Sequence, residues 1–255
     1  MNEEDTMQTN AAARPAPEET SGEAGGEAGH ESGGDAFEAL SAARRSVRAF
    51  TDRPVPQALL ERLLVAARRA PSGANLQPGR FWAVQGQARE RLSAALCQAW
   101  RDQIPEAEDY GYFPDPMPLA LRKRQVAAAQ ALYGALGVAR GDVQGRARQF
   151  ERNFCFFGAP VALVVTIDSG FGAGGFMDLG MCLHALMLAA QSQGLASCAI
   201  GALASYPQIV RAQLALPASQ LVVCGLALGW EDAQARVNRT RTGREPLQAY
   251  FSVLR

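Results

Sequence analysis

One helical segment, residues 178–193, sets the strongest limit on how this chain folds. Its side chains are apolar nearly all round the helix axis: Leu179, Met181, Leu183, Leu186, Met187, Leu188, Ala189 and Ala190. A helix without a polar face must lie either in the centre of a large core or in an interface between subunits. The sequence alone leaves both arrangements open.

Helices and short strands follow one another along the rest of the chain. Apolar residues at helical spacing predict helices over 56–70, 87–103, 119–136, 146–154 and 207–214. Short apolar runs predict strands over 80–84, 161–167, 196–201 and 221–228. This mixture of separate helices and strands predicts an α+β or α/β fold.

The first 35 residues differ sharply from the remainder. They carry nine acidic side chains against the single Arg14, a net charge of −8, so residues 36–255 carry +8 in a chain whose net charge is zero. The segment is rich in Gly, Ala and Glu and holds almost no large apolar residue, so burial cannot offset the entropy of ordering it. We therefore predict a disordered acidic tail over 1–35 and one folded domain over 36–255.

Cysteine and histidine usage narrows the possible chemistry. Five cysteines lie singly, without a C-x-x-C pair, which predicts reduced thiols in a cytoplasmic protein: Cys97, Cys155, Cys182, Cys198 and Cys224. The only histidines are His30 and His184, so one chain cannot build a site with two or three histidine ligands, and we expect no metal. We interpret His184 as a half-buried structural residue in the middle of a helix.

Two further classes of partner are not expected. No uninterrupted run of about 18 apolar residues is present, so we predict no membrane span. The arginines of the basic body are scattered in short groups, without a stripe interleaved with aromatic residues, so we do not expect nucleic acid as a partner. A smaller anion fits this distribution better.

The run GFGAGG, residues 170–175, has the G-x-G-x-x-G spacing of dinucleotide-binding loops. Two residues separate it from the preceding strand, and the next strand, 196–201, ends without the acidic residue that binds ribose. Asp178 also lies near the start of the following helix, where it would compete with a phosphate. We therefore interpret the run as a flexible loop.

The stronger anion candidate is RRSVRAF, residues 44–50. In an extended segment the alternating Arg44, Ser46 and Arg48 point to the same side, and two guanidinium groups with a hydroxyl form a good phosphate clamp. A solvated basic helix end is an equally good interpretation of these residues alone. The loop PSGANLQP, residues 71–78, and the cluster NRTRTGR, residues 238–244, add polar groups that could bind a planar heterocycle or a further anion.

These segments, in this order, resemble the nitroreductase family of FMN-dependent oxidoreductases. The matching pieces are residues 44–50, 59–78, 177–203, 222–232 and 238–247, and the resemblance covers residues 37–255. The chain is similar to bacterial reductases of nitroaromatic compounds such as nitrobenzoates. The resemblance implies an α+β fold with a mixed, mainly antiparallel central sheet flanked by helices. It also implies an intertwined homodimer with FMN at the interface, helix 178–193 in that interface and exchanged C-terminal segments.

The resemblance further implies an enzyme that takes electrons from NADH or NADPH and reduces nitroaromatic or similar electron-poor substrates by ping-pong hydride transfer. The flavin carries the chemistry, so no side chain is expected to be catalytic. Quinones, enones and halogenated phenols stay open as alternative acceptors, as does a flavin-binding protein without turnover.

Nine residues match the family's cofactor-binding positions. Arg44, Ser46 and Arg48 match the group that holds the FMN phosphate, ribityl chain or pyrimidine edge, and Arg45 belongs to the same motif. The remaining matches are the loop residues Ser72 and Asn75 at the isoalloxazine, Ile200 and Gly201 at flavin N5, and Arg244 at the phosphate. The chain departs from the family at Gly79, where a tryptophan is common, and at Ile200, where a polar residue is common.

Overall fold

The computed structural model describes residues 33–255, so residues 1–32 of the predicted tail lie outside the described residues. The first helix, α1, spans Gly33–Ala43 and so begins inside the segment predicted as tail. None of its residues is buried. The described part of the chain therefore starts with an exposed helix that leads directly into the arginine motif.

A four-stranded sheet forms the centre of the molecule. The strands β1 (Arg80–Val84), β2 (Val161–Asp168), β3 (Ala196–Ile200) and β4 (Gln220–Gly229) are ordered β1-β2-β4-β3, and each neighbouring pair is antiparallel. The parallel contact in the described residues is an isolated bridge between Ser46 and Ser197. The α+β prediction is confirmed, with a sheet that is antiparallel at every strand pair.

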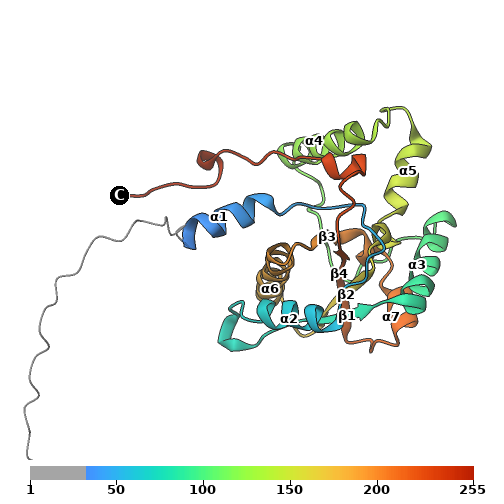
Figure 1. Ribbon diagram of the computed structural model, residues 1–255, viewed down its shortest axis with the longest axis horizontal. Helices are drawn as coiled ribbons and strands as arrows, with labels where there is room; N and C mark the ends of the chain where they lie inside the picture. Colours follow the sequence, from blue (N-terminus) through green and yellow to red (C-terminus); the bar gives the residue numbers. More distant parts are fainter. Residues whose placement is uncertain (1–32) are drawn as a thin grey trace, which may run out of the picture.

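Helices cover both faces of this sheet (Figure 1). On one face lie α2 (Gln57–Ala67) and α6 (Ala173–Ser192), and on the other α3 (Gly86–Arg101) and α7 (Pro207–Leu214). Successive side chains of β2 point to opposite faces of the sheet and pack into the hydrophobic core on each face. Val161 and Leu163 pack with α2 and α6, while Ala162 and Val164 pack with α3 and α7. A strand buried on both faces explains why residues 161–167 form a continuous apolar run.

Helix α6 buries one face and exposes the other. Leu179, Cys182, Leu186 and Ala190 recur every three or four residues and are buried, whereas Met177 is 64% exposed on the opposite side. The helix therefore belongs to the core and also presents apolar side chains outward. It is long and apolar enough to cross a membrane, a property that core helices of soluble proteins share, and its packing with α2 and the sheet is that of a core helix.

The glycine run is partly helical rather than a loop. Helix α6 begins at Ala173, five residues before the predicted start, so Gly174 and Gly175 lie in its first turn. A side chain at Gly175 would clash with Phe171, because an added β-carbon would lie only 2.6 Å from the Phe171 ring. The strands that α6 connects, β2 and β3, are separated by β4 in the sheet, so the paired parallel strands of a dinucleotide-binding unit are missing here.

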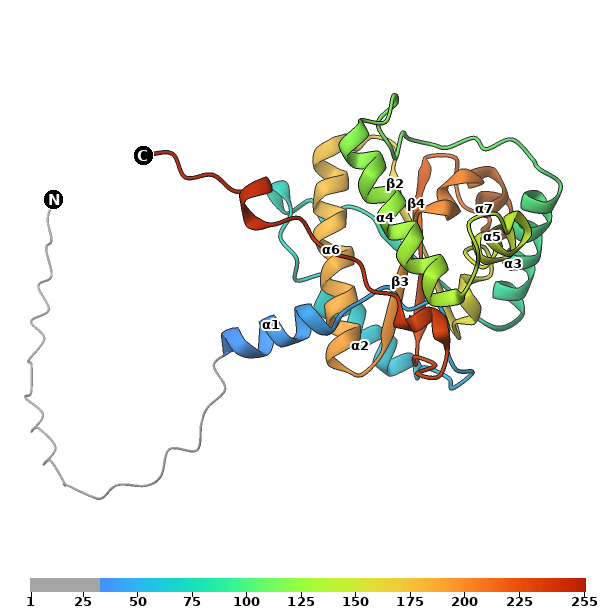
Figure 2. The same cartoon turned by 90° about the horizontal axis from the view of Figure 1, so that it is seen from above.

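Two further helices, α4 (Leu119–Leu136) and α5 (Val143–Glu151), and five short 3₁₀ turns complete the described chain. Helix α4 packs against the turn η4 (Arg236–Arg239) and has no buried residue. The C-terminal segment runs away from the body on the same side as α1 (Figure 2). It ends in exposed apolar side chains: Tyr250, Phe251, Val253 and Leu254.

Candidate functional site

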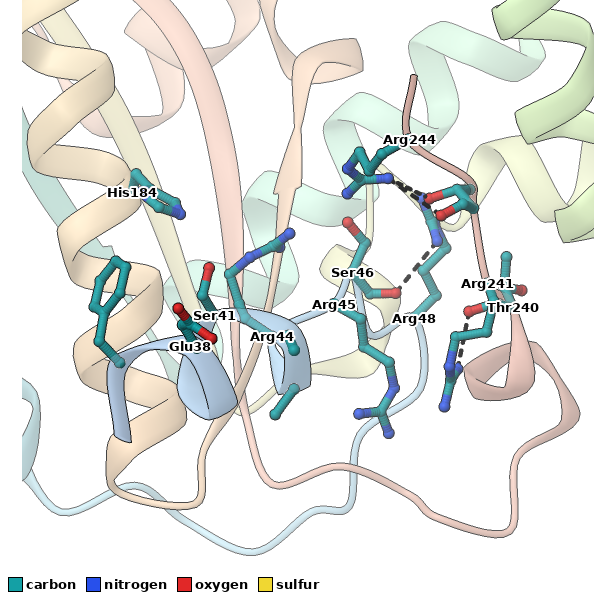
Figure 3. A pocket seen from close by; sticks show the side chains of 14 residues that line it. Glu38, Ser41, Arg44, Arg45, Ser46, Arg48, His184, Thr240, Arg241 and Arg244 are labelled. Carbon is teal, nitrogen blue, oxygen red and sulfur yellow. Dashed lines mark hydrogen bonds between the residues drawn. The ribbon is translucent and has the colours of Figure 1, made fainter. Parts of the chain in front are cut away.

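The arginine motif lines a cavity of about 850 Å³ at the end of α1. Its wall comes from the second half of α1, from residues 44–48, from residues 240–244 and from one residue of α6, His184. Figure 3 shows His184 on the opposite side of the cavity from Arg244. His184 is exposed and lines this cavity, so the sequence-based interpretation of a half-buried structural histidine was wrong.

The backbone of residues 44–50 is extended, as the alternation predicted. Val47 donates its N–H to the Ser197 carbonyl at the start of β3, 3.1 Å away, and Val47 and Ala49 are buried. The side chains of Arg44, Ser46 and Arg48 are therefore directed to the other side and line the cavity. The structure thus favours the clamp over a solvated helix end, because these residues follow α1 and do not belong to it.

Asn238 joins the two chain segments that form the cavity. Its side chain, 5% exposed, accepts a hydrogen bond from the Arg48 N–H at 2.8 Å and donates to the carbonyls of Ala49 and Asp232, each at 2.9 Å. A buried carboxamide with three partners fixes residues 48–49 against the turn before Thr240. No local pattern distinguishes Asn238 from the other residues of its polar cluster, so sequence reasoning missed this role.

Positive charge gathers in the cavity. Within residues 33–255, the guanidinium groups of Arg44, Arg48 and Arg244 form no ion pair. Arg48 donates to the Ser46 carbonyl, and Arg244 donates to the carbonyl and hydroxyl of Thr242 (Figure 3). Glu38 is the one carboxylate among the described lining residues. A bound anion would satisfy this excess of cations.

Arg45 points away from this group. Its guanidinium pairs with Glu231, 2.5 Å away, next to the end of β4, and Figure 3 shows it directed away from Ser46 and Arg244. The two partners are 186 positions apart in the sequence, so no local pattern could predict the pairing. The ion pair with Glu231 therefore separates the Arg45 guanidinium in role from those of Arg44, Arg48 and Arg244, although Arg45 still lines the cavity.

The predicted loop residues Ser72 and Asn75 do not line this cavity. Their loop is held internally, because Ser72 Oγ accepts the Gln77 N–H at 3.0 Å and Arg68 donates to the carbonyls of Gln77, Pro78 and Gly79. Asp178 in α6 accepts the Gly73 N–H at 3.0 Å. His184 lies almost two turns further along α6, so within one chain the loop and the arginines occupy different parts of that helix.

The structure explains why position 79 is a glycine, which the sequence alone did not. Its φ of +86° lies in the left-handed region, and an added β-carbon would lie 2.4 Å from Leu179 Cδ1. Leu179 is itself buried, so it has little room to move. The tryptophan common in the family at this position would not fit against α6 here.

Ile200 and Gly201 mark the end of β3, where the turn η3 (Gly201–Ser205) begins. The Ile200 side chain is buried in the core between the sheet, α3 and α7, which leaves its backbone as the group open to a ligand. The ring of Tyr112 lies over Gly201, 3.4 Å from the position of an added β-carbon. Tyr112 and the neighbouring Phe113 contact each other, with ring centroids 4.7 Å apart.

Comparison with known proteins adds independent findings. The model of the nitroreductase family matches residues 42–230. A 4-nitrobenzoate reductase of Pseudomonas putida is 38% identical over 216 residues, which cover 85% of this chain and 94% of the relative.

Solved structures agree with this sequence similarity. The FMN- and NADPH-dependent nitroreductase NfnB of Sphigopyxis sp. strain HMH superposes with a TM-score of 0.82 at 38% identity, covering 85% of this chain and 98% of that protein. The FMN-dependent NfnB of Mycobacterium smegmatis, solved with NADPH, gives a TM-score of 0.83 at 31% identity, covering 87% and 99%.

Proposed function

This chain belongs to the nitroreductase family, and from that premise we propose that it is an FMN-dependent oxidoreductase, which uses NADH or NADPH to reduce nitroaromatic compounds. The observation that carries the proposal is the group of three guanidinium side chains, from Arg44, Arg48 and Arg244, which face one cavity without a carboxylate partner in residues 33–255. The similar 4-nitrobenzoate reductase and the two NfnB enzymes support the choice of cofactor and acceptor.

The donor set in the cavity fits a phosphorylated cofactor. Arg44 and Arg244 supply charge-assisted donors to the FMN phosphate, and the Ser46 hydroxyl, two residues after Arg44, lines the same cavity. The cavity volume of about 850 Å³ lies within the range of small-molecule sites. FMN, when bound, accepts a hydride from the nicotinamide and transfers it to the electron-poor acceptor.

The protein's own part in the reaction is to place charge and to shape access. The backbone of Arg48 is hydrogen-bonded to the Asn238 side chain, which fixes the position from which its guanidinium extends. We assign to this guanidinium the role of stabilising the negative charge that would develop at the pyrimidine edge of the reduced flavin. The Gly201 N–H, at the end of β3, is the backbone donor assigned to flavin N5. Tyr112, which covers Gly201, limits how an aromatic acceptor approaches that turn.

We further assign the protein to a homodimer in which the loop 71–79 of one subunit faces the arginine cavity of the other. Ser72 and Asn75 do not reach the cavity of their own chain. The outward face of α6, with Met177 64% exposed, and the exposed side chains from Tyr250 to Leu254 supply apolar surface for the contact. A sedimentation or light-scattering mass near the 27.2 kDa of one chain would contradict the dimer.

Two other assignments rest on the sequence. The acidic segment 1–35 is proposed as a tail outside the FMN-binding domain, although residues 33–35 already belong to α1. A cytoplasmic location is proposed because all five cysteines are free thiols.

The visible spectrum of the purified protein tests the function directly. We expect the absorption bands of oxidised flavin, their loss on anaerobic addition of NADH or NADPH, and their return when 4-nitrobenzoate is added. A flavin that stays oxidised with excess NADH and excess NADPH would favour a flavin-binding protein without turnover. Reduction followed by reoxidation with a quinone but not with 4-nitrobenzoate would move the assignment to a different acceptor.

A further inference from the structure

A second site lies on the other side of the sheet, where α3 meets the chain between α5 and β2 (Figure 1). Trp100 packs on Phe150 and Phe154, with ring centroids 4.6 and 5.9 Å apart. The adjacent Arg101 forms an ion pair with Glu151 at 2.5 Å. These contacts fix the last turn of α3 against residues 150–154.

The same packing brings two cysteines together. Cys97 lies one helical turn before Arg101 in α3, and Cys155 lies four residues after Glu151. The ion pair between Arg101 and Glu151 therefore brings the segments that carry the two thiols together. The two side chains lie close enough that each thiol changes the pKa of the other. Both pack in the core cluster between the sheet, α3 and α7, where Cys97 is buried and Cys155 is half-buried.

The two thiols differ in acidity. The hydrogen bond from Cys97, followed by the positive charge of Arg152, lowers the pKa of Cys155 to about 6, although burial and Glu151 oppose this change. The hydrogen bond to Cys155 and burial raise the pKa of Cys97. The pair therefore favours the thiolate at Cys155 over a thiolate at Cys97, and a half-buried, more acidic thiol beside a second thiol is the arrangement of a redox-active pair.

We propose that Cys97 and Cys155 form an oxidative modification site, at which hydrogen peroxide converts the two thiols into a disulfide bond. The Cys155 sulfur attacks one peroxide oxygen, the O–O bond breaks, and the departing hydroxide takes a proton to leave as water. Cys97 then attacks the resulting sulfenic sulfur, and the hydroxyl group leaves with the Cys97 proton as a second water. Two thiols lose two electrons and two protons in total, and one peroxide becomes two waters.

The backbone beside Cys155 is held in one conformation. Phe156 and Phe157 have φ angles of 49° and 54°, in the left-handed region that bulky residues avoid, and both side chains are buried. Tight packing therefore maintains a strained turn that fixes the position of Cys155. The disulfide would join α3 covalently to this turn and close residues 97–155 into one loop, which should raise the melting temperature by roughly 10 °C.

The wild-type protein, purified with its FMN, provides the main test. We expect that brief exposure to hydrogen peroxide, followed by catalase, unfolding and alkylation, leaves Cys97 and Cys155 unalkylated and joined in one linked pair of peptides. Cys182, Cys198 and Cys224 are the internal control, since burial raises the pKa of each of these thiols and all three should be alkylated. Treatment with dithiothreitol should restore five alkylated cysteines.

Variants separate the two steps. Cys97→Ser should stop at the sulfenic acid, so dimedone should label Cys155, whereas Cys155→Ser should give neither disulfide nor label. Cys224→Ser is the matched control and should form the disulfide as the wild type does. Five alkylated cysteines in the wild type after peroxide, or a linked peptide that joins any other pair, would overturn the proposal even if a variant fails to fold.

Discussion

Two regions matched the family's cofactor-binding motifs, and they use their polar groups in opposite ways. In the arginine cavity, Arg44, Arg48 and Arg244 have no carboxylate partner within residues 33–255. In the loop 71–79, almost every polar group is used inside the protein: Arg68 donates to three carbonyls, Ser72 accepts from Gln77, and Asp178 accepts from Gly73. The exposed Asn75 side chain is the exception.

The contrast separates two tasks within the proposed binding site. Cations without partners repel one another and are stabilised when an anion binds, so the cavity gains most from its ligand. The loop is already ordered by its own hydrogen bonds, so it can offer a fixed surface at little further entropic cost. Substitutions in the cavity should therefore act on cofactor affinity, and substitutions in the loop on stability.

The largest expected effect is on stability, from a substitution in the loop 71–79. Gly79→Ala places a β-carbon against Leu179 at a φ of +86°, and we expect the free energy of unfolding to fall by about 3 kcal/mol. Urea denaturation measures the change. Gly141→Ala is the control, because its added β-carbon meets nothing within 4 Å, and equal losses in the two variants would remove the special role of Gly79.

The cavity is tested by Arg44→Ala and Arg244→Ala. Each removes a charge-assisted contact to phosphate, so we expect FMN affinity to fall by about 1.5–3 kcal/mol per variant, with little change in the stability of the apoprotein. Fluorescence titration with FMN gives the dissociation constants. Arg91→Ala, an exposed arginine of α3 on the other side of the sheet, is the matched control. Unchanged FMN retention in both cavity variants would contradict the site assignment.

The internal support of the loop is tested by Arg68→Met. Loss of the donors to Gln77, Pro78 and Gly79 should lower the free energy of unfolding by about 1–2 kcal/mol and increase proteolytic cleavage within residues 71–79. Arg62→Met, on α2, which ends one residue before Arg68, is the control because Arg62 has a single partner in Gln193. Weaker binding of FMN without faster cleavage would contradict the division of tasks between loop and cavity.

The smallest expected effect comes from Asp178→Asn. The carboxamide oxygen can still accept the Gly73 N–H, so we expect a loss of about 0.5 kcal/mol, whereas Asp178→Ala should cost about 1–2 kcal/mol. The two denaturation curves together separate the hydrogen bond from the charge. Equal losses would show that the charge of Asp178, and not its hydrogen bond, holds the loop.

Local pattern predicted much of the fold. The four strands and most helices lie where apolar periodicity placed them, because burial of one face imposes a period on each element. The extended segment 44–50 was predicted for the same reason, since alternation of Val47 and Ala49 with Arg44, Ser46 and Arg48 is a property of the strand conformation. The start of α6 was missed by five residues, because Gly174 and Gly175 are poor helix formers that tertiary packing holds in the helix.

The sequence by itself determined most elements and the family, and it supplied the proposed cofactor motifs, since each depends on residues close together in the chain. Tertiary structure decided the rest: the pairing of Arg45 with Glu231, the exposure of His184 at the cavity, the need for glycine at position 79, and the contact between Cys97 and Cys155. For Arg45, Gly79 and Cys97, the contacting residue lies far away in the sequence. For His184, the segments that form the rest of the cavity lie far away in the sequence. Local propensity carries no information about which distant side chains the sheet and its covering helices bring together.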